Sequence, residues 1–240
     1  MIVETQDYGR LFEDTGDIFV KQREVAAYAN ERLKAAAEGV ELPAAPEIIA
    51  DPRSIKVGLL STMTYEVLLF AIVGIASGLS FRDLTARLGL RHYDISGIWR
   101  PLVAWPAAYV GFAIYSTLIS QLDISWLEPQ STLPMGVARD DAALAMAGVL
   151  AIIAAPLSEE FFFRGFIFSG LIRWGFLPAA GLSALLFTLA HFDPGSIIPI
   201  FFVGLGMTWL FYGRGSLWDS IIFHMLFNGT SFAILVATSR

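Results

Sequence analysis

The sequence predicts an all-α polytopic transmembrane bundle of six to seven membrane helices, preceded by a short N-terminal soluble or interfacial helical segment. The first observation is composition: 55% of the 240 residues are hydrophobic and 16% are charged, whereas an ordinary soluble domain carries about 25% charged residues. The mean hydropathy is +0.61. The second observation is that apolar runs of about 20 residues, long enough to cross a hydrocarbon core of about 30 Å, recur along the chain. We therefore expect an integral membrane protein.

The N-terminal residues 1–56 differ in composition from the rest of the chain. Segment 20–38 is rich in good helix formers, and segment 39–53 contains three prolines and is typical of a linker. We therefore divide the chain into a tail, residues 1–56, and a transmembrane bundle, residues 57–240. The first 50 residues lack the apolar core of a secretory signal peptide, so the first span is expected to act as its own insertion signal.

The apolar runs define the membrane helices that we expect. Candidate spans lie near residues 57–79, 101–120, 142–158, 177–192, 196–212 and 217–237. Residues 158–174 are either a continuation of the third helix or a seventh, partly inserted segment. Pro156 favours a kink or a break at that point, because proline lacks a backbone N–H.

Lysine and arginine residues give opposing indications of orientation. Arg53 and Lys56, next to the first span, favour a cytoplasmic N-terminus, because cytoplasmic loops are enriched in these residues. The connection 80–100 carries four arginines and favours the cytoplasm as well, although one crossing separates it from the tail.

Cysteine content and net charge exclude several classes of function. The chain has no cysteine, which rules out disulfides, thiol nucleophiles and thiolate metal sites. Its net charge is −6. We expect no nucleic acid partner, because proteins that bind nucleic acid need a basic surface.

A cluster of charged side chains interrupts an apolar stretch at residues 159–165, where the sequence is EEFFFRG. Each such charge costs roughly 2.5–3.5 kcal/mol in hydrocarbon, so a cluster of them indicates a functional site. Glu160 and Arg164 are four residues apart with the acid first, the favoured arrangement for an ion pair on one helix face. The Glu159 side chain points about 100° away from that of Glu160 around the helix axis. We expect Arg164 to hold Glu160 ionised and Glu159 to face a cavity as a general base; a purely structural ion pair between helices is the alternative.

Three further polar residues follow in apolar segments. His191 ends the segment FTLAH, and His224 and Asn228 are four residues apart in HMLFN. Two donors on one helix face match the needs of an oxyanion hole. Taken singly, His191 is equally explained as an interhelical hydrogen-bond donor, and Asn228 is explained by helix packing.

Taken in order, the motifs EExxxRG, FxxxH and HxxxN resemble the membrane family that groups CAAX prenyl endoproteases with bacteriocin-processing and immunity proteins, often called the CPBP or Abi family. The resemblance covers roughly residues 142–237. It implies an intramembrane endopeptidase that hydrolyses a peptide bond near the membrane surface without a cofactor. It further implies that Glu159 and His191 activate a water, that His224 and Asn228 stabilise the oxyanion, and that Glu160 and Arg164 support them. We expect a peptide or protein substrate, contact with membrane lipid, and a location in a prokaryotic inner membrane.

Two rival interpretations stay open. Glu159, His191 and His224 are a donor set that suits zinc, although the chain contains no HExxH motif. Alternatively, the chain is a non-catalytic membrane subunit or an immunity-type binding protein that retains the polar cluster. Glu66, a carboxylate within the first span, favours the second alternative, and a membrane protein partner would then contact Glu66 or the N-terminal tail.

Overall fold

The computed structural model describes residues 52–122, 140–191 and 193–239, with single residues between 27 and 40 and between 124 and 138. The described residues are helical or connecting, with no strand among them, which confirms the predicted all-α class. In segment 20–38 the described residues 27, 31, 34, 35 and 38 are helical. The linker 39–53 lies almost wholly outside the described residues, so the boundary between tail and bundle stays a prediction.

Within the described residues, five helices are long and apolar enough to cross a membrane. They are α4 (Pro52–Ser77), α6 (Trp99–Gln121), the composite helix Asp141–Trp174, α11 (Ile197–Arg214) and α12 (Leu217–Ser239). The span expected at 177–192 is shorter than predicted, because helix α10 (Phe176–Leu189) has 14 residues. At about 1.5 Å per residue it rises about 21 Å, less than the hydrocarbon thickness.

The composite helix runs without a break from Asp141 to Trp174. Its parts are α7 (Asp141–Val149), the π segment η5 (Leu150–Ala154), α8 (Ala155–Glu159), the π segment η6 (Glu160–Phe168), α9 (Ser169–Leu171) and the 3₁₀ turn η7 (Ile172–Trp174). Residues 158–174 are therefore a continuation of the third helix. The break that Pro156 favoured is absent, and π segments instead lie on either side of α8, since proline removes one hydrogen bond of the regular ladder.

The composite helix begins at an ionic cap. Asp140 accepts a hydrogen bond from the backbone N–H of Ala143 at 2.8 Å and pairs with Lys56 at 2.8 Å. The Lys56 hydrogen bond, followed by those of the backbone amides, holds the pKa of the Asp140 carboxyl below its usual value. The start of α4 is thereby tied to the start of α7.

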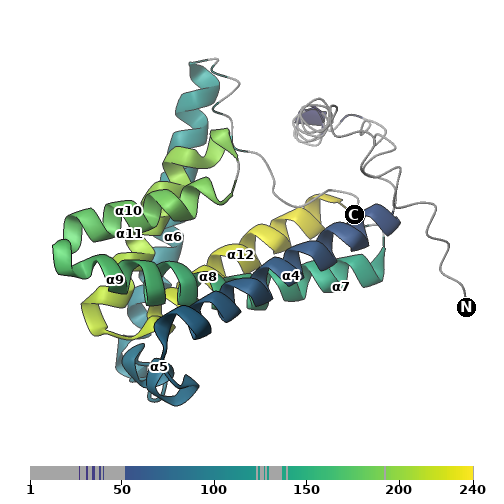
Figure 1. The fold of residues 1–240 in the computed structure, drawn as a ribbon. Coiled ribbons are helices and arrows are strands. Elements are labelled where there is room, and N and C mark those ends of the chain that lie inside the picture. Colours follow the sequence, from purple (N-terminus) through teal and green to yellow (C-terminus); the bar gives the residue numbers. More distant parts are fainter. Residues whose placement is uncertain are drawn as a thin grey trace, which may run out of the picture.

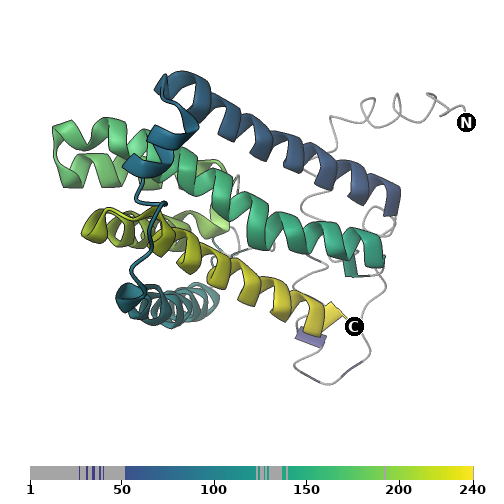
Figure 2. The same cartoon turned by 90° about the horizontal axis from the view of Figure 1, so that it is seen from below.

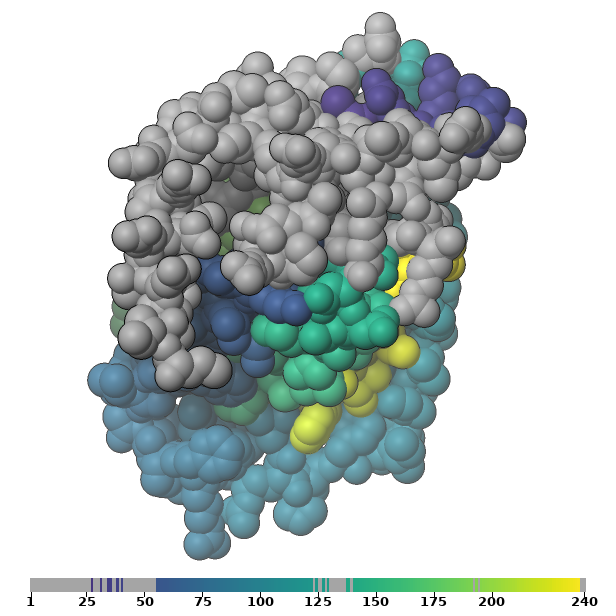
Figure 3. Space-filling model, turned by 90° about the vertical axis from the view of Figure 1, so that its right-hand side faces the viewer, coloured from purple at the N-terminus to yellow at the C-terminus, as the bar shows by residue number. Residues whose placement is uncertain are grey.

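The helices α4 and α12 lie on either side of the composite helix (Figures 1 and 2). Figure 3 shows α4, α7 and α12 meeting at one face of the molecule. Helices α10 and α11 pack together at the C-terminal end of the composite helix. Helix α6 contacts α11 and α12. The middle of the composite helix, which carries Glu159 and Glu160, is consequently enclosed by other helices.

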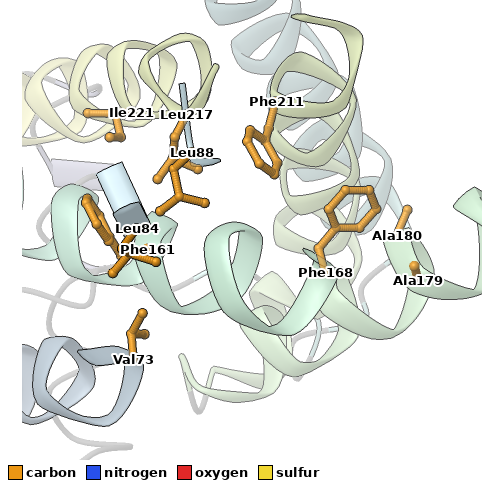
Figure 4. Close-up of a cluster of buried hydrophobic side chains, with 10 residues drawn as sticks. All are labelled: Val73, Leu84, Leu88, Phe161, Phe168, Ala179, Ala180, Phe211, Leu217 and Ile221. Carbon is orange, nitrogen blue, oxygen red and sulfur yellow. The ribbon is translucent and has the colours of Figure 1, made fainter. Parts of the chain in front are cut away.

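The hydrophobic core at that end joins the composite helix to its neighbours (Figure 4). Its buried members are Val73, Leu84, Leu88, Phe161, Phe168, Ala179, Ala180, Phe211, Leu217 and Ile221. Helix α5 (Phe81–Arg87) contributes Leu84, so this short helix is packed against the bundle. Because Phe161 and Phe168 of the composite helix are buried in this core, the core fixes how that helix is rotated.

A polar cluster closes the turn between α11 and α12. The Arg214 guanidinium lies 3.1 Å from a carboxylate oxygen of Asp94 and 3.7 Å from one of Asp219. It also occupies the space beside Gly97, where any larger residue would collide with it. Burial, followed by the nearby Asp219, raises the pKa of Tyr93 to about 12. These contacts dock the loop after α5 onto the first turn of α12.

The turn after α5 requires a glycine at position 89, where it packs against the turn between α11 and α12. Gly89 has φ +64°, and a Cβ there would lie 2.2 Å from the carbonyl oxygen of Gly215. We expect Gly89→Ala to lose about 1–2 kcal/mol through the left-handed conformation and about 1–3 kcal/mol more through overpacking. Gly78→Ala is the matched control, because Gly78 has φ +62° but open space around it. Thermal unfolding in detergent measures both; equal losses would contradict the close-approach explanation.

Candidate active site

The site is built from three elements that are far apart in sequence. The junction of α8 and η6 supplies Glu159, Glu160 and Arg164, helix α12 supplies His224, and the residue after α10's C-cap supplies His191. Glu160 and Arg164 are completely buried and His224 is 3% exposed. A group of charged side chains is thus held in the interior of the bundle.

Glu160 is the centre of this group. Its Oε1 atom accepts a hydrogen bond from Nη1 of Arg164 at 2.8 Å, so the expected ion pair is present. The same Oε1 atom lies 3.0 Å from Nδ1 of His224. Glu160 therefore connects the arginine of its own helix to the histidine of α12.

Arg164 is neutralised and positioned by three groups. Besides Glu160, its Nη2 atom donates to the carbonyl oxygen of Gly204 in α11 at 3.0 Å. Its guanidinium lies over the Phe187 ring, 4.3 Å from the centroid. A Cβ at position 204 would lie 3.4 Å from Nη2 and 3.1 Å from the Cβ of Ala184, so Gly204 lets α10 and α11 approach the arginine closely.

Glu159 has a different environment from its neighbour. Its side chain is 15% exposed, and its Oε2 atom lies 3.8 Å from Nε2 of His224. Within the described part of the chain Oε2 has no hydrogen-bond partner. The two nitrogens of His224 therefore face two adjacent glutamates, of which only Glu160 is paired with a cation at close range.

His191 and Asn228 have backbone partners. Nδ1 of His191 lies 2.8 Å from the carbonyl oxygen of Phe187, and Nδ2 of Asn228 donates to the carbonyl oxygen of Ala151 at 2.9 Å. The Phe187 ring contacts His191 at 4.7 Å and His224 at 5.8 Å between centroids. His191 and Asn228 therefore lie at the edge of the cluster formed by Glu159, Glu160, Arg164 and His224. His191 is separated from His224 by the Phe187 ring, and Asn228 lies one turn after His224 on α12.

Ser158 is a site residue that sequence reasoning missed. It is completely buried and hydrogen bonded to Glu66 of α4, which is 4% exposed. Its position directly before Glu159 was the only available signal, since a serine in an apolar helix is unremarkable by itself.

The donor atoms do not form a metal-ligand set. No group of three histidine, cysteine, aspartate or glutamate side chains is arranged to hold a metal ion among the residues that the structure describes. Both nitrogens of His224 face carboxylates, and His191 directs Nδ1 to a backbone carbonyl.

Comparison with known proteins adds the family. Residues 141–230 match the family model described as type II CAAX prenyl endopeptidase Rce1-like. The match contains all six candidate residues of the site and confirms the resemblance to CAAX-type membrane proteases. At the level of the Rce1-like family, it supports a CAAX-type intramembrane protease. No curated protein and no solved structure matches the chain.

Proposed function

We propose that this protein is an intramembrane endopeptidase in which Glu159 activates a water molecule for attack on a peptide bond. The observation that carries the proposal is the contrast between the two adjacent glutamates. Among the described residues Oε2 of each glutamate is buried without a hydrogen-bond partner, but Oε1 of Glu160 is paired with Arg164 at 2.8 Å and contacts His224 at 3.0 Å, whereas Glu159 faces His224 across 3.8 Å. A carboxylate held free beside a histidine fits the role of a general base.

The geometry favours His224 as the partner of Glu159. If Nδ1 of His224 donates to Glu160, Nε2 is left as a neutral acceptor that faces Glu159 across 3.8 Å. A gap of that length is too long for a direct hydrogen bond and suits a bridging water. His191 instead contacts Phe187 and is left as a candidate for polarising the substrate carbonyl.

In this mechanism the Glu159 carboxylate takes one proton from the water as its oxygen attacks the carbonyl carbon. The tetrahedral oxyanion then collapses, the C–N bond breaks, and Glu159 returns the proton to the leaving nitrogen. The products are an amine and a carboxylic acid, which keeps the second proton of the water until it ionises in solvent, and no covalent intermediate with the protein forms. We place this reaction at a peptide or protein substrate near the membrane surface of a prokaryotic inner membrane.

Cleavage by the purified protein tests this proposal directly. In detergent or nanodiscs, the protein should cut members of a peptide library that includes lipidated and unmodified versions of each sequence. A strong chelator should leave the rate unchanged, and metal analysis should find less than one zinc per chain, because a glutamate-activated water needs no Lewis acid. Stoichiometric zinc with chelator-sensitive cleavage would replace this mechanism by a metal-dependent one. The absence of any cleavage by the intact protein would favour the non-catalytic binding subunit.

Asn228→Ala tests whether Asn228 stabilises the oxyanion. One N–H of the Asn228 carboxamide donates to the Ala151 carbonyl. The second N–H can donate to the oxyanion in the transition state. We expect turnover to fall by roughly 10²–10³-fold. Ser231→Ala is the control, because Ser231 also makes an interhelical hydrogen bond from α12, to Tyr109 at 2.7 Å. A similar loss in both variants would show that α12 packing, and not oxyanion stabilisation, explains the effect.

A further inference from the structure

Glu66 is a buried carboxyl group that the proposed mechanism does not use. It lies in α4, outside the family match at residues 141–230, and is 4% exposed. It makes no ion pair with the lysines, arginines and histidines that the structure describes. A lone carboxylate in such a place is costly, so a carboxyl group there is expected to carry its proton.

The hydrogen bonds of Ser158 also favour a protonated Glu66. The Ser158 hydroxyl lies 2.8 Å from the carbonyl oxygen of Ala154, 3.2 Å from that of Ala155, and within hydrogen-bond contact of Oε2 of Glu66. A serine hydroxyl has one proton, and a carbonyl oxygen only accepts. If Ser158 donates to Ala154, its contact with Glu66 is satisfied only when Glu66 supplies the proton.

The charged groups around Glu66 agree with a neutral side chain. Electrostatic interactions connect it to Glu159 on the composite helix, to His191 after α10 and to the adjacent Tyr65. Glu160, directly after Glu159, and Arg164 neutralise each other at 2.8 Å. A second negative charge at position 66 would therefore repel Glu159 without a strong cation to offset it.

We propose that Glu66 is a protonated positioning residue of the active site, which donates its proton to Ser158 and so holds the turn that carries Glu159. This inference rests on the proposed function for its kinetic consequence. Ser158 directly precedes Glu159, and the contact joins α4 to the composite helix where α8 meets η6. Glu66 thereby fixes the rotation of that turn while keeping a second charge away from the base.

Substitutions at both ends of the contact test the kinetic consequence. Glu66→Gln keeps a donor for Ser158, so its turnover should stay within about twofold of wild type and its pH–rate profile should not move. Glu66→Leu and Ser158→Ala each remove the contact and should lower kcat by about 10–100-fold through misplacement of Glu159. The double variant should lose no more than either single one, because both remove one interaction. Thr64→Val is the control, since among the described residues the Thr64 hydroxyl bonds only to the Leu60 carbonyl, on the exposed face of α4.

Infrared spectroscopy tests the protonation without any activity. The difference between wild type and Glu66→Gln should contain the band of a protonated carboxyl group, present throughout neutral pH and shifted by Ser158→Ala. A missing band, or a Glu66→Gln variant with a displaced acidic limb of kcat/KM, would overturn the inference. If the intact protein cleaves no peptide, the proposed function fails, and the infrared result still decides the state of Glu66.

Discussion

Arg164→Met is expected to destabilise the protein by about 3–5 kcal/mol, because it leaves the Glu160 carboxylate buried without its cation. Both side chains are completely buried, 2.8 Å apart, and the substitution also removes the donor to the Gly204 carbonyl. Thermal unfolding in detergent measures the loss. Arg173→Met on the same helix is the matched control, since Arg173 is exposed, and its cost should stay within about 0.5 kcal/mol.

A double variant separates the cost of an unpaired charge from the worth of the pair. Glu160→Leu combined with Arg164→Met buries no charge, so it should recover most of the stability that Arg164→Met loses. It should not recover peptide cleavage, because His224 then lacks the carboxylate that faces its Nδ1 atom at 3.0 Å. If Arg164→Met alone unfolds like wild type, the cluster is not held together by this ion pair.

The parts of the site that the sequence predicted are local to one helix. The pairing of Glu160 with Arg164 follows from their spacing, and so does the different direction of Glu159, since neighbouring residues on a helix point about 100° apart. The membrane helices were predicted because a run of apolar residues is sufficient to recognise a span. The exception is α10, which is bounded by Gly175 at φ +100° and is shorter than its hydropathy indicates.

The parts that the sequence did not predict depend on how helices pack. The spacing of His224 and Asn228 placed them on one face of α12, but their partners are Glu160 and the Ala151 carbonyl, which lie at different points of the composite helix. The contact between Glu66 and Ser158 joins residues 92 positions apart. Periodicity within a segment carries no information about either, because it does not specify which neighbouring helix a face will meet.

The central claim is that Glu159 is the base, and the single-turnover rate of Glu159→Gln tests it most directly. Glutamine keeps the size of the side chain but cannot take up the proton of the water. General bases contribute about 10²–10⁴-fold, so we expect a cleavage rate lower by that factor. Insertion and thermal stability should be unchanged or improved, since an amide costs less than a carboxylate in hydrocarbon. Asp83→Asn, at an exposed carboxyl in α5, should cleave like wild type. Full cleavage by Glu159→Gln would contradict the account and make Glu160 the next residue to test.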